Sequence, residues 1–234
     1  MRIDVITIFP GTLNGFLGES MLKRATRMGA VEFNILDPRD FAQDARRTTD
    51  DRPYGGGTGM VMKPEPLFEA VEHVRTPGAR VILMTPQGRT FRQAEARRLA
   101  GERHLVFLCG HYEGVDERVR EALVTDELSI GDYVLTNGVL PAAVVIDSVV
   151  RLMPGVLGGG DAATEEESFT TPLLEYPHYT RPPEFRGMTV PQVLLCGDHK
   201  AVASWRRAKA VERTAKRRPD LLAAPGGATP ATGE

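Results

Sequence analysis

The sequence predicts an α/β fold built on a parallel sheet, followed by a small α-helical region at the C-terminus. Two observations predict the sheet: short apolar segments alternate with helical segments, and the first apolar segment is apolar on both of its faces. The chain has 234 residues, of which 41% are hydrophobic and 26% charged, as in ordinary folded proteins. This length allows one large domain or a main domain with a smaller companion, and we expect two.

The predicted strands are short and strongly apolar. Residues 2–10 are apolar on both faces, which suits a strand buried inside a parallel sheet. Further strands are predicted over residues 31–36, 80–84 and 104–109.

A helix is predicted over residues 90–100, between the last two strands. Thr90 and Gln93 form a capping-box pair at its start. Gly101 can adopt the left-handed conformation that often follows the last helical residue.

The domain organisation follows from a change in composition near residue 160. Before it, Pro141 is predicted to open a helix over residues 142–153, because proline is tolerated at the first helical position. After it, residues 158–168 are glycine-rich and then acidic without an apolar period, which predicts a mobile linker. The predicted organisation is a main domain over residues 1–160, an acidic linker over 161–170, a basic helical domain over 171–222 and a disordered tail over 223–234.

The C-terminal region concentrates positive charge. Residues 190–195 are predicted to form a short helix, and Asp198 is predicted to cap a longer one. The predicted apolar stripe of the longer helix consists of Val202, Trp205, Ala208 and Val211. Residues 200–218 contain eight lysines or arginines against one glutamate, and such a concentration of charge favours a polyanion as partner.

Location and redox state follow from what the sequence lacks. No apolar run approaches the roughly 18 residues that a membrane helix needs, so we expect a cytoplasmic protein without a membrane span. The two cysteines, Cys109 and Cys196, lack the close Cys/His spacing of a zinc site and are expected to be reduced thiols of the core.

Four segments combine glycine with polar residues: 50–60, 85–88, 110–118 and 129–141. The first lacks both the Gly-Lys-Ser/Thr ending of a P-loop and the GxGxxG pattern, so a plain flexible loop is its simpler interpretation. The second and third follow predicted strands, where open α/β sheets bind ligands. Each of them alone could be an ordinary turn.

Together, six segments resemble the tRNA (guanine-N1)-methyltransferase family in order and spacing. They are residues 50–57, 85–88, 110–114, 129–135, 154–158 and 177–182. The resemblance spans nearly the whole chain, and several motifs in one order are more specific than any single glycine loop. Because the family belongs to the SPOUT class, the resemblance implies a trefoil knot at the C-terminal side of the main domain and a homodimer whose active site combines both chains.

The resemblance also implies S-adenosylmethionine as the methyl donor and guanosine 3′ of the tRNA anticodon as the acceptor. The implied donor pocket is formed by Met84, Thr85, Pro86, Gly110, Tyr112, Glu113, Gly114, Ile130, Gly131, Tyr133, Leu135, Asn137, Gly138 and Pro141. Residues 136–139 depart from the family, which more commonly has two glycines and a glutamate there.

Methylation of guanine at N1 needs a base, because neutral guanine carries a proton on that atom. It also needs a positive group to stabilise the charge that moves onto O6, so a carboxylate and an arginine suffice. The resemblance assigns the second role to Arg151. It assigns the base to Glu167, at a position where the family has aspartate, and leaves Glu165 and Glu166 open as alternatives.

Residues that could contact tRNA are Arg24, Asp50, Arg52, His178, Tyr179, Arg206 and Arg207. The rings of His178 and Tyr179 can stack on unpaired bases, and arginines can bind phosphates. The simpler readings are a packed histidine, a salt bridge between Asp50 and Arg52, and solvated surface charge. Mg²⁺ can assist the reaction in this family, but no metal-ligand spacing marks a site in this sequence.

Three alternatives remain at this point. The first is another SPOUT methyltransferase that modifies a different RNA nucleoside, and the second is an RNA-binding module that keeps a vestigial cofactor loop. The third is a nucleotide-dependent dehydrogenase, which the missing dinucleotide fingerprint disfavours.

Overall fold

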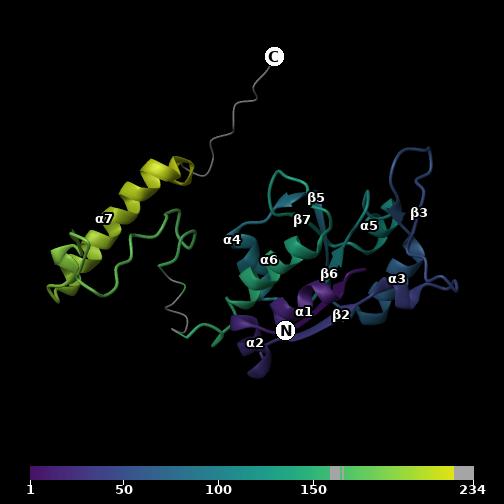
Figure 1. The fold of residues 1–234 in the computed structure, drawn as a ribbon, viewed down its shortest axis with the longest axis horizontal. Helices are drawn as coiled ribbons and strands as arrows, with labels where there is room; N and C mark the ends of the chain where they lie inside the picture. Colours follow the sequence, from purple (N-terminus) through teal and green to yellow (C-terminus); the bar gives the residue numbers. More distant parts are fainter. Residues whose placement is uncertain (159–163, 165, 224–234) are drawn as a thin grey trace, which may run out of the picture. The chain divides into compact units, whose positions relative to one another are not determined.

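The computed structural model describes residues 1–158, 164 and 166–223 (Figure 1). The chain forms two compact units, Met1–Gly160 and Asp161–Glu234. The predicted linker lies partly outside the described residues, and the predicted tail lies outside them apart from residue 223. Among the described helices, none combines the length and the apolar character needed to cross a membrane.

Unit 1 is built on a five-stranded parallel sheet with strand order β2-β1-β6-β5-β7. The strands are β1 (Arg2–Ile6), β2 (Glu32–Leu36), β5 (Arg80–Thr90), β6 (His104–Cys109) and β7 (Asp126–Ser129). This confirms the predicted α/β class with a central parallel sheet. The predicted strand over residues 80–84 is the first half of a longer strand, and β7 was not predicted.

Side chains along the central strands alternate between two hydrophobic cores. Ile82, Leu105 and Phe107 face one core, whereas Val81 and Val106 face the other. A strand with helices on both faces buries every side chain. This explains why these segments are apolar throughout and do not alternate between apolar and polar residues.

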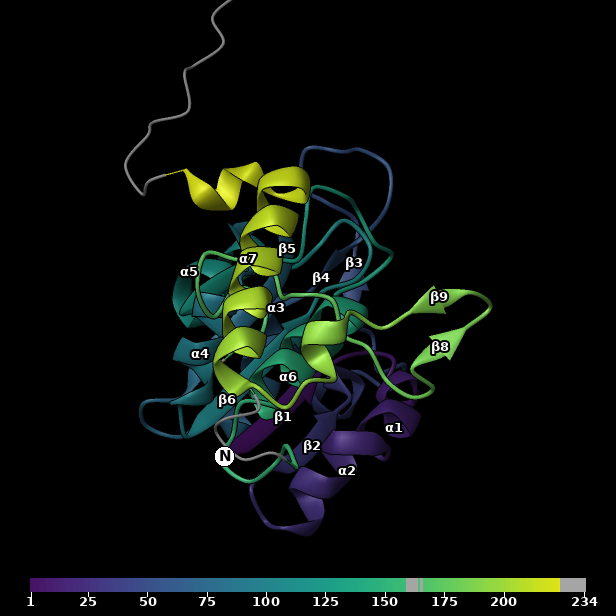
Figure 2. The same ribbon diagram turned by 90° about the vertical axis from the view of Figure 1, so that its left-hand side faces the viewer.

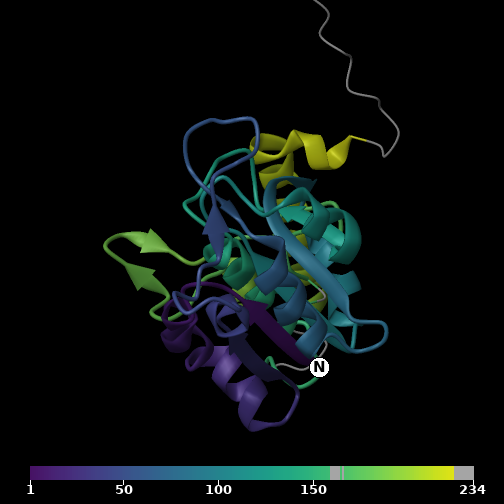
Figure 3. The ribbon, with the colours of Figure 1, turned by 90° about the vertical axis from the view of Figure 1, so that its right-hand side faces the viewer.

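Helices α1 (Gly11–Leu17), α2 (Ser20–Arg27), α4 (Gln93–Ala100) and α6 (Val139–Val150) contribute side chains to the first core. The second core contains side chains of α3 (Pro64–Val74) and α5 (Glu117–Leu123), with the short 3-10 helix η1 (Pro38–Phe41) beside α3. Strands β3 (Asp50–Asp51) and β4 (Val61–Met62) form a separate hairpin, which extends beyond the sheet (blue in Figure 3).

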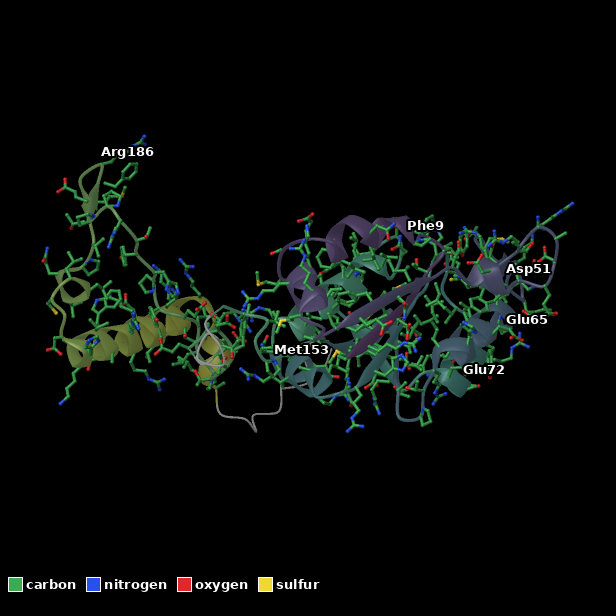
Figure 4. The ribbon with its side chains drawn as sticks, turned by 90° about the horizontal axis from the view of Figure 1, so that it is seen from below. Phe9, Asp51, Glu65, Glu72, Met153 and Arg186 are labelled. Atoms are coloured by element: carbon green, nitrogen blue, oxygen red, sulfur yellow. The ribbon has the colours of Figure 1, made fainter. Side chains whose placement is uncertain are left out.

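Unit 2 contains the long helix α7 (His199–Arg217), the hairpin β8 (Glu184–Phe185) and β9 (Met188–Thr189), and the 3-10 helices η3 (Gln192–Leu194) and η4 (Pro219–Leu222). The hairpin stands away from α7 (Figure 2), and Arg186 lies at its tip (Figure 4). The helix predicted over residues 190–195 is a single 3-10 turn. The predicted cap of α7 is confirmed, since the Asp198 carboxylate accepts hydrogen bonds from the backbone N–H groups of Lys200 and Ala201.

The predicted apolar stripe of α7 is wrong in its second half. The helix advances about 100° per residue, so an interval of three falls behind by about 60° each time. Val211 therefore lies on the opposite side from Val202 and is 40% exposed. The buried residues of α7 are instead Ala210 and Thr214, in step with the true helical period.

Two predicted helix starts are also wrong. Thr90 belongs to β5 and Arg92 precedes α4 without a side-chain cap, because the sheet extends strand pairing to Thr90. Gly101 follows α4 in a right-handed conformation, with φ −83°. Pro141 is the third residue of α6, which begins at Val139 and ends at Val150.

The expectation of two core thiols holds for only one cysteine. Cys109 lies at the end of β6 and is buried, and burial raises the pKa of its thiol. Cys196 is exposed, because the turn after η3 carries it to the surface.

One carboxylate joins three arginines at the edge of the sheet. Asp126 begins β7, its side chain is 5% exposed, and it forms ion pairs with Arg80, Arg89 and Arg98 at 2.6–3.0 Å. Burial by itself would raise the pKa of Asp126, but hydrogen bonds from Thr125 and Arg80 and the charge of Arg98 outweigh it. The pKa is therefore below its ordinary value.

We predict that Asp126→Asn lowers the free energy of unfolding by about 1–3 kcal/mol at pH 7, because hydrogen bonds to charged groups are lost. A lowered folded-state pKa stabilises the fold above the unfolded-state value and ceases to do so as pH falls through the folded-state value. The difference between wild type and variant should therefore shrink below about pH 4. Urea unfolding at pH 7 and pH 3 measures it, and a difference that stays constant would contradict this account.

Candidate functional site

Three loops of unit 1 converge on one cavity of about 290 Å³. It lies beside a bulge in the middle of β5 and at the carboxyl ends of β6 and β7, where open α/β sheets bind ligands. All fourteen residues of the expected pocket line it: Met84, Thr85, Pro86, Gly110, Tyr112, Glu113, Gly114, Ile130, Gly131, Tyr133, Leu135, Asn137, Gly138 and Pro141. The lining also includes residues that the prediction omitted, namely Leu83, Gln87, His111, Val115, Leu128, Ser129, Val134 and Thr136. Six of these eight lie inside the glycine-containing segments 85–88, 110–118 and 129–141, so membership in these segments was the signal that could have found them.

The first wall is a bulge in the middle of β5. Met84 and Arg89 both pair with Leu128 of β7, so residues 85–88 are displaced from the ladder. A Cβ atom at Gly88 would lie 2.5 Å from the backbone nitrogen of Leu128. Glycine there lets the two strands close again behind the bulge.

The second wall is the loop after β6. Tyr112 has a left-handed backbone with φ 58°, and the His111 ring packs 4.9 Å from Phe9 and 4.4 Å from Tyr112. Burial, and then the neighbouring carboxylate of Asp50, raise the pKa of the Tyr112 hydroxyl. Asp50 therefore lies beside this wall. Glu113 is the one acidic or basic side chain, histidine apart, among the residues that line the cavity.

The third wall runs from β7 to the start of α6. Asn137 accepts a hydrogen bond at 2.9 Å from the backbone N–H of Val139, the first residue of α6. Gly138 donates its N–H to the carbonyl oxygen of Gly110 at 2.9 Å. A Cβ atom at Gly138 would lie 2.9 Å from the Cα of Cys109 and 3.1 Å from the Cβ of Met84. This backbone contact closes the third wall against the second.

The two residues expected to carry the chemistry lie outside this set. Arg151 follows the last residue of α6, at the other end of the helix from the cavity, and is not among the lining residues. Glu167 is half-buried and belongs to unit 2. Of its alternatives, Glu165 lies outside the described residues. Glu166 accepts a hydrogen bond from the hydroxyl of Tyr176 at 2.8 Å and lies 3.6 Å from Arg206.

The expected RNA-contact residues of unit 1 lie at different places. Arg24 in α2 donates a hydrogen bond to the carbonyl oxygen of Gly155 at 3.3 Å. Asp50 lies beside Tyr112, and Arg52 is exposed in the loop after β3. The structure describes no salt bridge between Asp50 and Arg52, and the backbone N–H of Arg52 donates a hydrogen bond to the Asp51 carboxylate.

In unit 2, aromatic and basic side chains gather beside α7. Arg206 lies over the ring of Tyr176, 4.7 Å from its centre, and His178 packs against the same ring at 4.9 Å. Tyr179 is 49% exposed and lies 6.3 Å from the ring of Trp205. Arg207 is exposed. Tyr176 and Trp205 were not predicted to belong to this group, because the sequence alone does not show which aromatic rings lie close together in the fold.

Comparisons with known proteins agree with one another. A family model described as "tRNA (Guanine-1)-methyltransferase TrmD" matches residues 1–224. A relative from Geobacillus kaustophilus, named tRNA (guanine-N(1)-)-methyltransferase, is 57% identical over 224 residues, covering 95% of this chain and 91% of the relative. Relatives of the same name from Moorella thermoacetica and Brevibacillus brevis are each 59% identical, over 95% of this chain and 90% and 91% of their own lengths.

We predict that Gly138→Ala lowers the free energy of unfolding by about 1–3 kcal/mol, because the added methyl group overpacks against backbone that cannot move aside. Gly101→Ala is the matched control. Gly101 has nearly the same backbone angles, φ −83° and ψ −8° against −80° and −1°, but its Cβ would have an ordinary contact of 3.5 Å. Thermal unfolding of both variants measures the effect, and equal losses would show that crowding at Gly138 is unimportant.

Proposed function

We propose that this chain, which belongs to the tRNA (guanine-1)-methyltransferase family, transfers a methyl group from S-adenosylmethionine to N1 of the guanosine 3′ of the tRNA anticodon. Its class as a methyltransferase follows from the family. The observation that carries the finer proposal is the convergence of three loops on one cavity, which includes every residue expected in the donor pocket.

The lining of this cavity suits the donor. Glycine backbone and apolar side chains such as Ile130 and Leu135 can enclose an adenine ring, while exposed backbone N–H and C=O groups can bind its edge. The donor supplies an electrophilic methyl group on a positively charged sulfur. A cavity with a single carboxylate, that of Glu113, favours such a cation.

Two residues are proposed to act on guanine. The carboxylate of Glu167 accepts the proton from N1, and the guanidinium of Arg151 stabilises the negative charge that develops on O6. Glu166, whose carboxylate contacts Tyr176 and Arg206, is the other described candidate for the base. Glutamate has one more methylene group than the aspartate that the family has at this position. The backbone before Ser168 must therefore lie further from the guanine ring.

The position of Arg151 supports a homodimer whose active site combines two chains. The 12 residues of α6 separate it from the cavity by about 18 Å, at 1.5 Å per residue. Met153, two residues after Arg151, and Asp51 of the β3–β4 hairpin lie at opposite ends of unit 1 (Figure 4). Leu140 and Val144 are 57% and 47% exposed on the side of α6 that leads toward Arg151. A second chain packed on this side would cover them and bring its own Arg151 toward the cavity.

The remaining parts of the proposal concern the knot, the RNA and the metal. We propose that the segments around the cavity form the trefoil knot of the SPOUT class. Arg24, Asp50 and Arg52 of unit 1 and His178, Tyr179, Arg206 and Arg207 of unit 2 are proposed tRNA contacts, supported by exposed cations and rings. The described residues contain no cluster of three or more His, Cys, Asp or Glu side chains that could hold a metal ion, and no step is assigned to Mg²⁺.

We predict that Glu167→Gln and Arg151→Ala each bind S-adenosylmethionine normally but reduce turnover by about 10²–10⁴-fold, because each removes one group needed in the transition state. The measurement is methyl transfer to tRNA transcripts with or without guanosine 3′ of the anticodon, together with calorimetric titration of the donor. Glu166→Gln is the matched control. Full activity of Glu167→Gln would move the base to another carboxylate, and methylation of the transcript without that guanosine would reject the proposed target.

A mixed dimer tests the shared active site. Thr85→Trp would fill the cavity, and Arg151→Ala removes the arginine, so each variant alone should be nearly inactive. If cavity and arginine come from different chains, a dimer with one subunit of each kind contains one intact site and regains about half of wild-type activity. Co-expression with two affinity tags isolates this dimer. No recovery above the two parents would place cavity and arginine in the same chain.

A further inference from the structure

The loop between β3 and β4 is held against the second wall of the cavity by backbone hydrogen bonds. Glu113 donates its N–H to the carbonyl oxygen of Met60 at 3.0 Å, and Met62 donates to Gly114 at 2.9 Å. Asp116 then donates to Met62 at 3.0 Å. These bonds form a short ladder that fixes the end of the loop relative to the backbone of Glu113.

Gly59 lies just before this ladder, directly against the side chain of Glu113. A Cβ atom at Gly59 would lie 2.3 Å from Oε1, 2.7 Å from Cγ and 2.9 Å from Cδ of Glu113, closer than any real contact. The carboxylate and its alkyl chain therefore both rest on the surface that the missing side chain leaves open. Because the ladder fixes both backbones, any side chain at position 59 must displace that of Glu113.

The charge of Glu113 gives this contact a consequence for binding. Glu113 is the one carboxylate among the residues that line the cavity, and its side chain is exposed. The attraction between a carboxylate and a cation depends on the distance between them, so it depends on where the Glu113 side chain lies. The donor carries positive charge on its sulfur and on its amino group, so the orientation of this carboxylate affects donor affinity.

We propose that Gly59 is a positioning residue for the donor site. By leaving room for the Glu113 side chain, it allows that carboxylate to adopt the orientation that binds the cationic donor, and it couples the β3–β4 loop to the cavity. This inference rests on the proposed use of S-adenosylmethionine, and it assigns a specific role to a glycine that the sequence marked only as part of a flexible loop.

The loop itself offers a matched control. Gly56 and Gly59 both have φ +82°, so alanine introduces the same left-handed strain at either position. A Cβ atom at Gly56 would have no atom within 4 Å. Gly56→Ala therefore measures backbone strain alone, whereas Gly59→Ala adds the displacement of Glu113. Because Glu113 is exposed and can rotate away, the two variants should have similar melting temperatures.

The experiment titrates S-adenosylmethionine into the full chain by calorimetry and measures methyl transfer to tRNA. Gly59→Ala should weaken donor binding by about tenfold or more, the magnitude of a lost hydrogen bond to a charged group, and raise the KM for the donor at little cost in kcat. Gly56→Ala should change both values by less than about twofold, well below that magnitude.

A double variant shows whether the effect acts through Glu113. In a Glu113→Ala background the displaced side chain is gone, so adding Gly59→Ala should weaken donor binding no further than adding Gly56→Ala does. Equal effects of Gly59→Ala and Gly56→Ala in the wild-type background would overturn the inference, as would additive effects of Gly59→Ala and Glu113→Ala. If the wild-type chain binds no S-adenosylmethionine, the proposed function fails instead.

Discussion

Gly138 packs on the backbone of Cys109 and Gly110 with no space for a side chain, and the cavity depends on this contact. Its N–H bonds to the carbonyl oxygen of Gly110, which places the start of α6 at the end of β6. The loop from β7 must then fold over the strand ends to reach α6. Three segments that are distant in the sequence thereby become the walls of one site, and glycine is required at the point where they meet.

Helix α6 connects the cavity to Arg151, one of the two residues proposed to act on guanine. Its first turn closes the cavity, its buried side packs into the first core, and Arg151 follows its last residue. Because the helix separates Arg151 from the cavity of its own chain, the proposed reaction takes its arginine from a second chain. The exposed residues of α6 give that chain a surface to cover, and the carboxylate proposed as base comes from unit 2.

Individual elements show where local rules succeeded and where they failed. Asp198 caps α7 as predicted, because this hydrogen bond depends only on residues within one turn. Thr90 also has the local pattern of a helix cap, yet it lies in β5 because pairing with Ser129 of β7 extends the strand. Val211 fits an interval of three but not the period of the helix. Long-range pairing and exact helical geometry prevailed over short patterns.

The sequence by itself determined the α/β class, the family, and which loops would meet. The reason is that apolar strands and the order of the motifs can be recognised from residues that are close to one another in the sequence. Only the tertiary structure decided that Gly59 lies against Glu113 and that Asp50 lies beside Tyr112. The physical reason is that these relations join residues whose separation depends on how strands pair and helices pack. The conformational preferences of the individual residues in each pair do not determine the distance between them.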